Sequence, residues 1–342
     1  MKKGFIGFMV TITLLMMVVG AAWVKSAEAK PVVLKFASVE PPKGFNNQKV
    51  WIPMFDKMNK EAEGIFKIEN FSGGTLGRNP MQLMKILMDG VADLVHVINA
   101  YLPGQLVDDQ VFNIPFAAKN CSDCTMSIQY MQEKKVLRGY DELFILGQIC
   151  LPQYLVHTKF PVKVPGDLEG KKMRTAGKIH HALAKACGAT PVAIPITNTA
   201  ESISRGVVGG TFSDWNAMLT FRINDVAKYH CIVPFGTNSL TVAMTKKKYA
   251  SLPPKGRAVI DKYSGGYFSR FLAEALDEHI ADIEAKTRKD PKHTVYTPNA
   301  EETKQWRAVL DPVIASWSKE HDTWDNLLKA YKDGLAKANS LK

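Results

Sequence analysis

The segment between residues 167 and 215 constrains the fold more than any other part of this sequence. Short strand-like runs alternate there with runs of helical apolar spacing. The strand-like runs are 172–174, 190–194 and 207–215, and the helical runs are 179–187, which ends at Gly188, and a second one that begins at Asn198 or Thr199. Strands and helices that alternate at this length predict a parallel sheet with right-handed crossovers. The sequence therefore predicts an α/β fold.

Polar residues follow two of these predicted strands. Arg174 ends the first one, and Asp214, Trp215 and Asn216 end the third. Ligands of open parallel sheets bind beyond the carboxyl ends of the strands. A guanidinium at such a place suits an anion, because it can form two parallel charge-assisted hydrogen bonds with a carboxylate. We therefore expect Arg174 to bind a carboxylate in a cleft that the other three residues also face.

Further candidate ligand-binding residues lie in other predicted strands and in the loops that follow them. They are Glu40 after the strand 32–38, Asn99 and Tyr101 after the strand 92–98, Gln153 and Tyr154 in the apolar run 147–158, and Phe212. Aromatic residues also serve as core packing, and that explanation stays open for Phe212 and Trp215. Tyr101 either packs on the ligand or covers a hinge.

Five segments of the chain match a known family in order. They are VVLKFASVEPPKG at 32–44, FSGGTLGRNPMQLMKILMDGVADLV at 71–95, DLEGKKMR at 167–174, GATPV at 188–192 and RGVVGG at 205–210. Together they resemble the solute receptors of tripartite ATP-independent periplasmic (TRAP) transporters, of the dicarboxylate-binding-protein type. The resemblance implies that Arg174 forms a salt bridge with the carboxylate of the substrate. Sialic-acid receptors of the family carry a second arginine near the position where this chain has Gln153 and Tyr154.

The resemblance also implies the architecture. We expect a two-lobed periplasmic binding protein with mixed sheets, whose lobes are joined by crossover strands and a long helix. Lobe 1 is expected to comprise residues 31–152 and about 236–265. Lobe 2 is expected to comprise residues 153–235 and about 266–342, including the C-terminal helices.

The expected function is that of a periplasmic receptor. It captures a small organic acid between the lobes and delivers it to the integral membrane subunits of a TRAP transporter. The aromatic residues near the cleft favour an aromatic or otherwise apolar monocarboxylate, and no cofactor is expected. A receptor for an ATP-driven importer or a sensor is the alternative. An exported enzyme is disfavoured, because the sequence has no GxSxG or HExxH motif and no convincing carboxylate pair.

The N-terminus predicts export. Lys2 and Lys3 precede an apolar run from about residue 4 to 24, and Ala27-Glu28-Ala29 forms a small-x-small cleavage pattern. We therefore expect a cleavable signal peptide at residues 1–29 and a periplasmic location. An uncleaved membrane anchor is the alternative, because the apolar run is longer than an ordinary signal core.

The chain is basic. Its formal net charge is +11, and removal of residues 1–29 takes away three lysines and one glutamate, which leaves +9. Such a charge attracts anions at low ionic strength. Nucleic-acid binding is disfavoured, because the basic residues are dispersed and only Lys246-Lys247-Lys248 forms a cluster.

The cysteines and histidines leave several alternatives. Cys121 and Cys124 are compatible with a redox pair, a local disulfide or half of a metal site, but the sequence has no second paired motif. The pairing of the remaining three cysteines is open. His180 and His181 are expected to be surface or capping residues, so no metal site is predicted.

Overall fold

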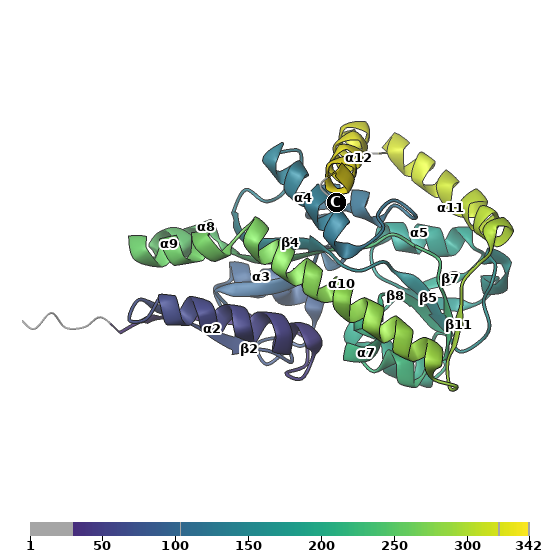
Figure 1. Cartoon of the computed structure of the whole chain (residues 1–342), viewed down its shortest axis with the longest axis horizontal. Helices are drawn as coiled ribbons and strands as arrows, with labels where there is room; N and C mark the ends of the chain where they lie inside the picture. Colours follow the sequence, from purple (N-terminus) through teal and green to yellow (C-terminus); the bar gives the residue numbers. More distant parts are fainter. Residues whose placement is uncertain (1–29, 103, 321, 341–342) are drawn as a thin grey trace, which may run out of the picture.

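Two mixed sheets form the framework of the protein (Figure 1). The computed structural model describes residues 30–102, 104–320 and 322–340, so the predicted signal peptide lies outside the described residues. The first sheet has five strands in the order β2 (Phe66–Phe71), β1 (Val32–Ala37), β3 (Leu94–Ile98), β10 (Ser239–Thr245) and β4 (Leu143–Cys150). Its strand β10 runs antiparallel to β3 and β4, whereas β1 is parallel to β2 and β3.

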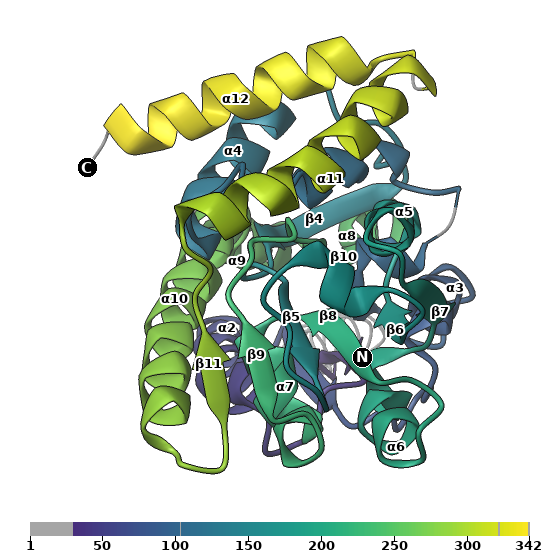
Figure 2. The same ribbon diagram turned by 90° about the vertical axis from the view of Figure 1, so that its right-hand side faces the viewer.

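The second sheet has six strands, which Figure 2 shows side by side. Their order is β11 (Thr294–Tyr296), β9 (Tyr229–Cys231), β5 (Leu155–Thr158), β8 (Gly210–Ser213), β6 (Lys172–Thr175) and β7 (Thr190–Ala193). Strand β6 is parallel to β7 and β8, and β5 is antiparallel to β8 and β9. The predicted α/β fold with mixed sheets is therefore confirmed.

The segment that dominated the sequence analysis folds as its pattern predicts. Helix α5 (Lys178–Ala186) connects β6 to β7, and α6 (Thr199–Ser204) connects β7 to β8. Gly188 ends the first connection with a φ of +76°, a conformation that glycine adopts without strain. Because β6 and β8 are parallel neighbours, their carboxyl ends bring Arg174 and Asp214 to the same edge of the sheet.

A long helix spans both halves of the molecule. Helix α10 (Gly266–Lys289) packs on β4 and α4 (Cys121–Glu133) next to the first sheet, and on β11 and α7 (Trp215–Thr220) next to the second (Figure 1). Its buried side chains include Phe268, Leu272, Leu276 and Ile283, which recur at helical spacing. We call the half around the first sheet lobe 1 and the half around the second sheet lobe 2.

The two C-terminal helices pack on different lobes (Figure 2). Helix α11 (Ala300–Glu320) contacts α5 of lobe 2, and the indole N–H of Trp306 donates to the carbonyl of Lys163 at 2.9 Å. Helix α12 (Trp324–Ser340) contacts α4 and the 3₁₀ helix η4 (Val107–Asn113), where Tyr331 meets Phe112 edge to face. The sequence-based division grouped α12 with lobe 2, whereas the structure places it on lobe 1.

Shorter elements complete the fold. The remaining α-helices are α2 (Ile52–Glu61), α3 (Leu83–Met88), α8 (Lys246–Ser251) and α9 (Pro254–Tyr263), and the short helical turns are η1 (Asn47–Trp51), η2 (Pro80–Gln82), η3 (Asn99–Tyr101), η5 (Pro165–Leu168), η6 (Ile196–Asn198) and η7 (Ile223–Asp225). Within residues 30–102, 104–320 and 322–340, no helix has the length and apolar character that crossing a membrane requires.

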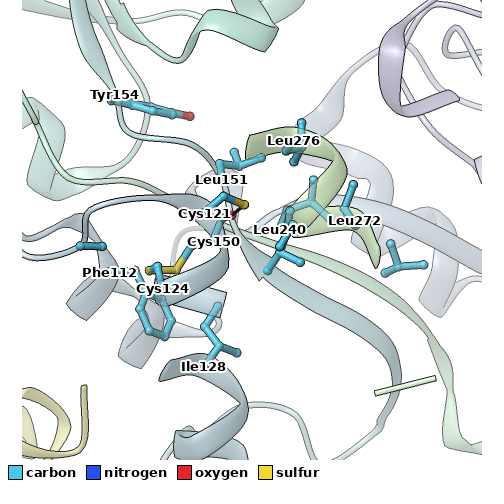
Figure 3. Close-up of a cluster of buried hydrophobic side chains, with 14 of the residues drawn as sticks. Phe112, Cys121, Cys124, Ile128, Cys150, Leu151, Tyr154, Leu240, Leu272 and Leu276 are labelled. Atoms are coloured by element: carbon cyan, nitrogen blue, oxygen red, sulfur yellow. Dashed lines mark hydrogen bonds between the residues drawn. A yellow bond between two sulfur atoms is a disulfide. The ribbon is translucent and has the colours of Figure 1, made fainter. Parts of the chain in front are cut away.

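A disulfide lies in the core of lobe 1. Cys124 of α4 is bonded to Cys150 of β4, among apolar side chains that include Phe112, Ile128 and Leu240 (Figure 3). Cys121, Cys187 and Cys231 are buried free thiols. Of the alternatives for Cys121 and Cys124, a local disulfide is therefore not formed, and Cys124 pairs across the fold instead. No group of three or more metal-ligating side chains among the described residues has a geometry that could hold a metal ion.

We expect this disulfide to stabilise the protein by about 3 kcal/mol, because it closes a loop with a sequence separation of 26 residues and so restricts the unfolded chain. Replacing both Cys124 and Cys150 by alanine is expected to lower the urea midpoint accordingly. Reductant serves as the control. It should lower the midpoint of the wild type and leave that of the double variant unchanged, and an unchanged wild-type midpoint contradicts the assignment.

Candidate functional site

Arg174 is a buried cation without a carboxylate partner. Its side chain stands at the end of β6 and is 1% exposed. Nε donates to the carbonyl of Ile194 at 2.8 Å, Nη1 to the carbonyl of Phe212 at 3.4 Å, and Nη2 to the hydroxyl of Tyr101 at 2.6 Å. No Asp or Glu of the described chain lies within ion-pair distance of it. A guanidinium has five N–H donors, so Arg174 retains donors for an anion.

Tyr101 joins the two lobes at this point. It belongs to η3 of lobe 1, and its hydroxyl oxygen accepts from Arg174 and from the backbone N–H of Ile196 at 3.0 Å, both in lobe 2. These two donors converge on a single oxygen, which is the arrangement that a carboxylate oxygen also accepts. The hydroxyl proton of Tyr101 stays available for donation to a further acceptor.

A small central cavity of about 30 Å³ lies between the lobes next to Tyr101. Lobe 1 contributes loops that follow β1 and β3, and lobe 2 contributes the end of β8 and the first turn of α7. The lining residues are Val39, Glu40, Asn46, His96, Ile98, Tyr101, Leu151, Tyr154, Ile196, Ser213, Asp214, Asn216, Ala217, Phe221 and Leu240. Because this volume is smaller than an aromatic acid, such a ligand requires the lobes or the side chains to move.

The structure brings half of the predicted site residues to this cavity. Glu40, Tyr101, Tyr154, Asp214 and Asn216 line it together. Asp214 caps the N-terminus of α7 and accepts from the backbone N–H of Ala217 at 2.9 Å. Arg174 lies directly behind the wall, through its bond to Tyr101.

Four other predicted residues do not line the central cavity. Phe212 stacks on Phe235 with ring centroids 4.4 Å apart. Trp215 packs against His157 and His230 inside lobe 2. Gln153 is partly buried next to Tyr154 and does not reach the lining. For the two aromatic residues, these positions agree with the alternative of core packing.

The fourth, Asn99, lines a larger outer cavity of about 460 Å³ that also lies between the lobes. Its amide donates to Asp109, to Tyr140 and to Thr241. Burial raises the pKa of Asp109 to about 6, against the hydrogen bonds that it accepts. The side chain of Asn99 is therefore held in a polar network of lobe 1.

Two buried carboxyl groups set the electrostatics of the central cavity. Burial and the nearby Asp214 raise the pKa of Glu40 to about 8, against hydrogen bonds from Asn46 and Trp51. Burial also raises the pKa of Asp214 to about 6, against backbone hydrogen bonds and the charge of Arg174. Glu40 therefore holds its proton more strongly than Asp214 does, and the cation of Arg174 lies behind the wall that both carboxyl groups face.

Comparison with known proteins assigns the family. The model of the DctP family, described as bacterial extracellular solute-binding protein, family 7, matches residues 36–321. The chain belongs to this family of solute-binding proteins. The C4-dicarboxylate-binding periplasmic protein DctP of Rhodobacter capsulatus is 25% identical over 295 residues, which cover 84% of this chain and 86% of that protein. The resemblance that the sequence motifs indicated is confirmed.

Solved structures of TRAP solute-binding proteins share the fold. One from Rhodoferax ferrireducens T118, in complex with copurified benzoate, is 25% identical with a TM-score of 0.85 and covers 91% of this chain and 99% of its own. Another, from a marine metagenome, is specific for aromatic acid ligands and was solved in complex with 3-hydroxybenzoate. It is 25% identical, has a TM-score of 0.84, and the match covers 91% of this chain and 99% of that chain. This solute-binding protein therefore has the two-lobed fold of the TRAP receptors.

Three polar residues that line the cavity were missed by the sequence analysis: Asn46, His96 and Ser213. Each is at most 4% exposed. His96 is a polar residue within the otherwise apolar strand β3, and Ser213 directly precedes Asp214. Those two signals were available in the sequence, whereas Asn46 reaches the site only through the folding of the loop after β1.

A chain of three histidines leads from the surface of lobe 2 to the end of β8. His157 Nε2 lies 3.2 Å from the carbonyl of Ser213, and its Nδ1 lies 2.8 Å from Nδ1 of His230. His230 Nε2 lies 2.8 Å from His293 Nδ1, and His293 Nε2 lies 3.4 Å from Lys228 Nζ. Because a carbonyl only accepts and an ammonium only donates, we assign neutral rings whose donors all point toward Ser213.

His180 is also buried, which corrects the expectation of a surface or capping position. Its ring nitrogens lie 3.1 Å from the carbonyl of Ala176 and 3.0 Å from that of Phe235. The ring stacks on Tyr154, whose side chain lines the central cavity. Phe235 is far from His180 in the sequence, so the sequence around His180 does not indicate this contact. His181 is exposed as expected.

The buried histidines predict a loss of stability in acid. Burial lowers the pKa of His157 to about 3, whereas a histidine in the unfolded chain has a pKa of about 6.5. Between these values the unfolded state binds the extra proton, so the contribution of His157 is complete above about pH 6.5 and falls by about 1.4 kcal/mol per pH unit below it. We expect the variant His157→Gln to show a correspondingly smaller slope of unfolding free energy between pH 6 and pH 4.

The exposed His181→Gln provides the matched control, with the slope of the wild type. Urea titrations at each pH measure both variants. Equal slopes for His157→Gln and the wild type would show that His157 is protonated in the folded protein.

Proposed function

We propose that this solute-binding protein is a periplasmic receptor that acts by binding alone, without catalysis. It captures a small aromatic or otherwise apolar monocarboxylate between its lobes and delivers it to the integral membrane subunits of a TRAP transporter. The observation that carries this proposal is the buried guanidinium of Arg174, whose acceptors are three neutral oxygens. A buried cation is stabilised when an anion forms charge-assisted hydrogen bonds with it.

The walls of the central cavity support the choice of an apolar acid. Aromatic and aliphatic side chains surround it, including Tyr101, Tyr154, Phe221, Ile98 and Leu240. No Lys or Arg is among the residues that line it, all of which belong to the described chain. The two related structures with benzoate and 3-hydroxybenzoate support the same class. A dicarboxylate is disfavoured, because its second charge would approach Glu40 and Asp214 without a cation.

Closure of the lobes completes the site in this proposal. Arg174 and Ile196 belong to lobe 2, and Tyr101 approaches them from lobe 1. A carboxylate at Arg174 can accept the hydroxyl proton of Tyr101 and so connect the lobes. Binding then favours the closed shape, and a membrane partner distinguishes loaded from empty receptor by that shape. Export by cleavage after residue 29 would place the receptor in the periplasm.

Arg174→Lys is expected to weaken binding of the carboxylate by about 2 to 5 kcal/mol, or roughly 30-fold and more, because a lysine lacks the fork of donors. Arg174→Ala is expected to abolish binding, and also to lower stability, since the carbonyls of Ile194 and Phe212 lose their donor. Isothermal titration calorimetry measures the affinities.

Arg205→Ala is the matched control, because Arg205 is an exposed arginine of lobe 2 that pairs with Glu201. Its affinity is expected to equal that of the wild type. A wild-type affinity in Arg174→Lys refutes the proposed role of Arg174.

Aromatic acids are expected to stabilise the protein more than sugar acids do, because the cavity is lined mainly by apolar and aromatic side chains. A thermal-shift screen with benzoate, phenylacetate, succinate and glucuronate at equal concentrations tests this order. Stabilisation by glucuronate or succinate alone overturns the assignment of the ligand class and leaves the receptor role intact.

A further inference from the structure

Four polar atoms at the central cavity form no hydrogen bond of normal geometry within the described chain, although the indole N–H of Trp51 lies near the Glu40 carboxyl. They are Glu40 Oε2, Asn46 Oδ1, His96 Nε2 and Ser213 Oγ, and all four residues line the cavity. Their exposed fractions are 4%, 1%, 4% and 0%. Buried polar atoms in folded proteins nearly always have partners, because a missing hydrogen bond destabilises the fold. We call these four residues the polar pocket.

Neighbouring contacts determine which of these atoms donate and which accept. The Ser38 hydroxyl accepts from the backbone N–H of Glu40 at 3.1 Å and lies 3.0 Å from His96 Nδ1. We assign the single hydroxyl proton of Ser38 to the contact with Nδ1, which places the proton of the neutral ring on Nε2. Burial lowers the pKa of His96 to about 4, which keeps the ring neutral. His96 therefore presents an N–H to the cavity.

The amide of Asn46 is oriented in a similar way. Its Nδ2 donates to Glu40 Oε1 at 2.8 Å, so Oδ1 is the atom left as an acceptor. Glu40 Oε2 accepts when the carboxyl is ionised, and both donates and accepts when it is protonated. In either state, the polar pocket combines at least one donor with at least one strong acceptor.

We infer that the polar pocket binds a hydroxyl group of the ligand, so that the ligand is a hydroxylated aromatic monocarboxylate and Glu40 determines this specificity. A hydroxyl has one proton and an acceptor oxygen, so it can accept from His96 Nε2–H and donate to one of the two oxygens, Glu40 Oε2 or Asn46 Oδ1. An ammonium group only donates and would oppose His96. A second carboxylate only accepts and would oppose Asn46 and the charge of Asp214.

This inference rests on the proposed function, because it requires the carboxylate of the same ligand at Arg174. Arg174 belongs to lobe 2, whereas Glu40, Asn46 and His96 belong to lobe 1. The two ends of the ligand would thus contact opposite walls of the cavity. Specificity for the hydroxyl would then be expressed only when the lobes close.

Calorimetry on the full mature protein tests the inference with matched ligands. The parent acids are benzoate and phenylacetate, and each is compared with its three ring-hydroxylated isomers. We expect at least one isomer to bind about tenfold tighter than its parent, because a site built around a hydroxyl leaves polar atoms unpaired without it. 3-(Aminomethyl)benzoate and isophthalate replace the hydroxyl by a cation and by a second carboxylate, and both should bind more weakly than that isomer.

Glu40→Leu replaces the carboxyl by an apolar side chain of similar size, and we expect the preference for the hydroxylated isomer to fall to about threefold or less. His96→Phe removes the N–H and keeps a ring next to Trp51, which lies 5.3 Å away in the wild type, and it is expected to reduce the same ratio. Glu63→Leu alters an exposed carboxylate of lobe 1 and should leave the ratio unchanged. Circular dichroism and the thermal midpoint confirm that each variant is folded.

The outcomes separate this inference from the proposed function. A hydroxyl preference that depends on Glu40, with all binding sensitive to Arg174→Lys, supports both. Equal affinities of parent and hydroxylated acids that still depend on Arg174 overturn the hydroxyl inference alone. Tighter binding of the ammonium compound or of isophthalate also overturns it. Affinities that are independent of Arg174 refute the proposed function itself.

Discussion

The buried guanidinium of Arg174 is the interaction on which the rest of the site depends. From the end of β6, it donates to the carbonyl of Ile194, which follows β7, and to the carbonyl of Phe212 in β8. It also donates to Tyr101, which belongs to lobe 1. A cation in this place needs a complete set of acceptors, because burial removes its water. The hydrogen-bond acceptors that the protein supplies are neutral oxygens, and the carboxyl of Asp214 interacts with the charge of Arg174 without forming an ion pair. Under the proposed function, the carboxylate of the ligand supplies a charged acceptor to this guanidinium.

Local patterns in the sequence predicted the strands and helices around the site. They did not predict in which direction all of its side chains point. The glycine at 188 and the apolar periodicity predicted β6, α5 and β7, and parallel order then placed Arg174 at the same edge of the sheet as Asp214. The sides taken by Phe212 and Trp215 depend on the partners they meet, Phe235 and the histidine pair, which come from distant segments. Composition made both residues look suitable for a ligand, but packing against those partners decided their positions.

Long-range contacts account for the other differences. The apolar face of helix α12 indicates that the helix packs on the body of the protein, but its sequence does not indicate on which lobe. The contact of Tyr331 with Phe112 shows that it packs on lobe 1. The same holds for Cys124, whose partner Cys150 lies on a neighbouring strand. The buried ring of His180 contacts a carbonyl of the segment after β9 and stacks on Tyr154. None of these partners belongs to the same helix or strand as the residue concerned.

The division of polar groups between the lobes has a consequence for transport. Lobe 2 carries the cation, and its histidine chain holds the carbonyl of Ser213 with neutral donors that add no charge. Lobe 1 carries most of the polar pocket, which lines the cavity between the lobes. Under the proposed function, an acid that satisfies Arg174 alone gains little from closing, whereas one that also fills the polar pocket stabilises the closed shape. Because a ligand shifts a conformational equilibrium only by its difference in affinity for the two states, selectivity and closure would have the same origin.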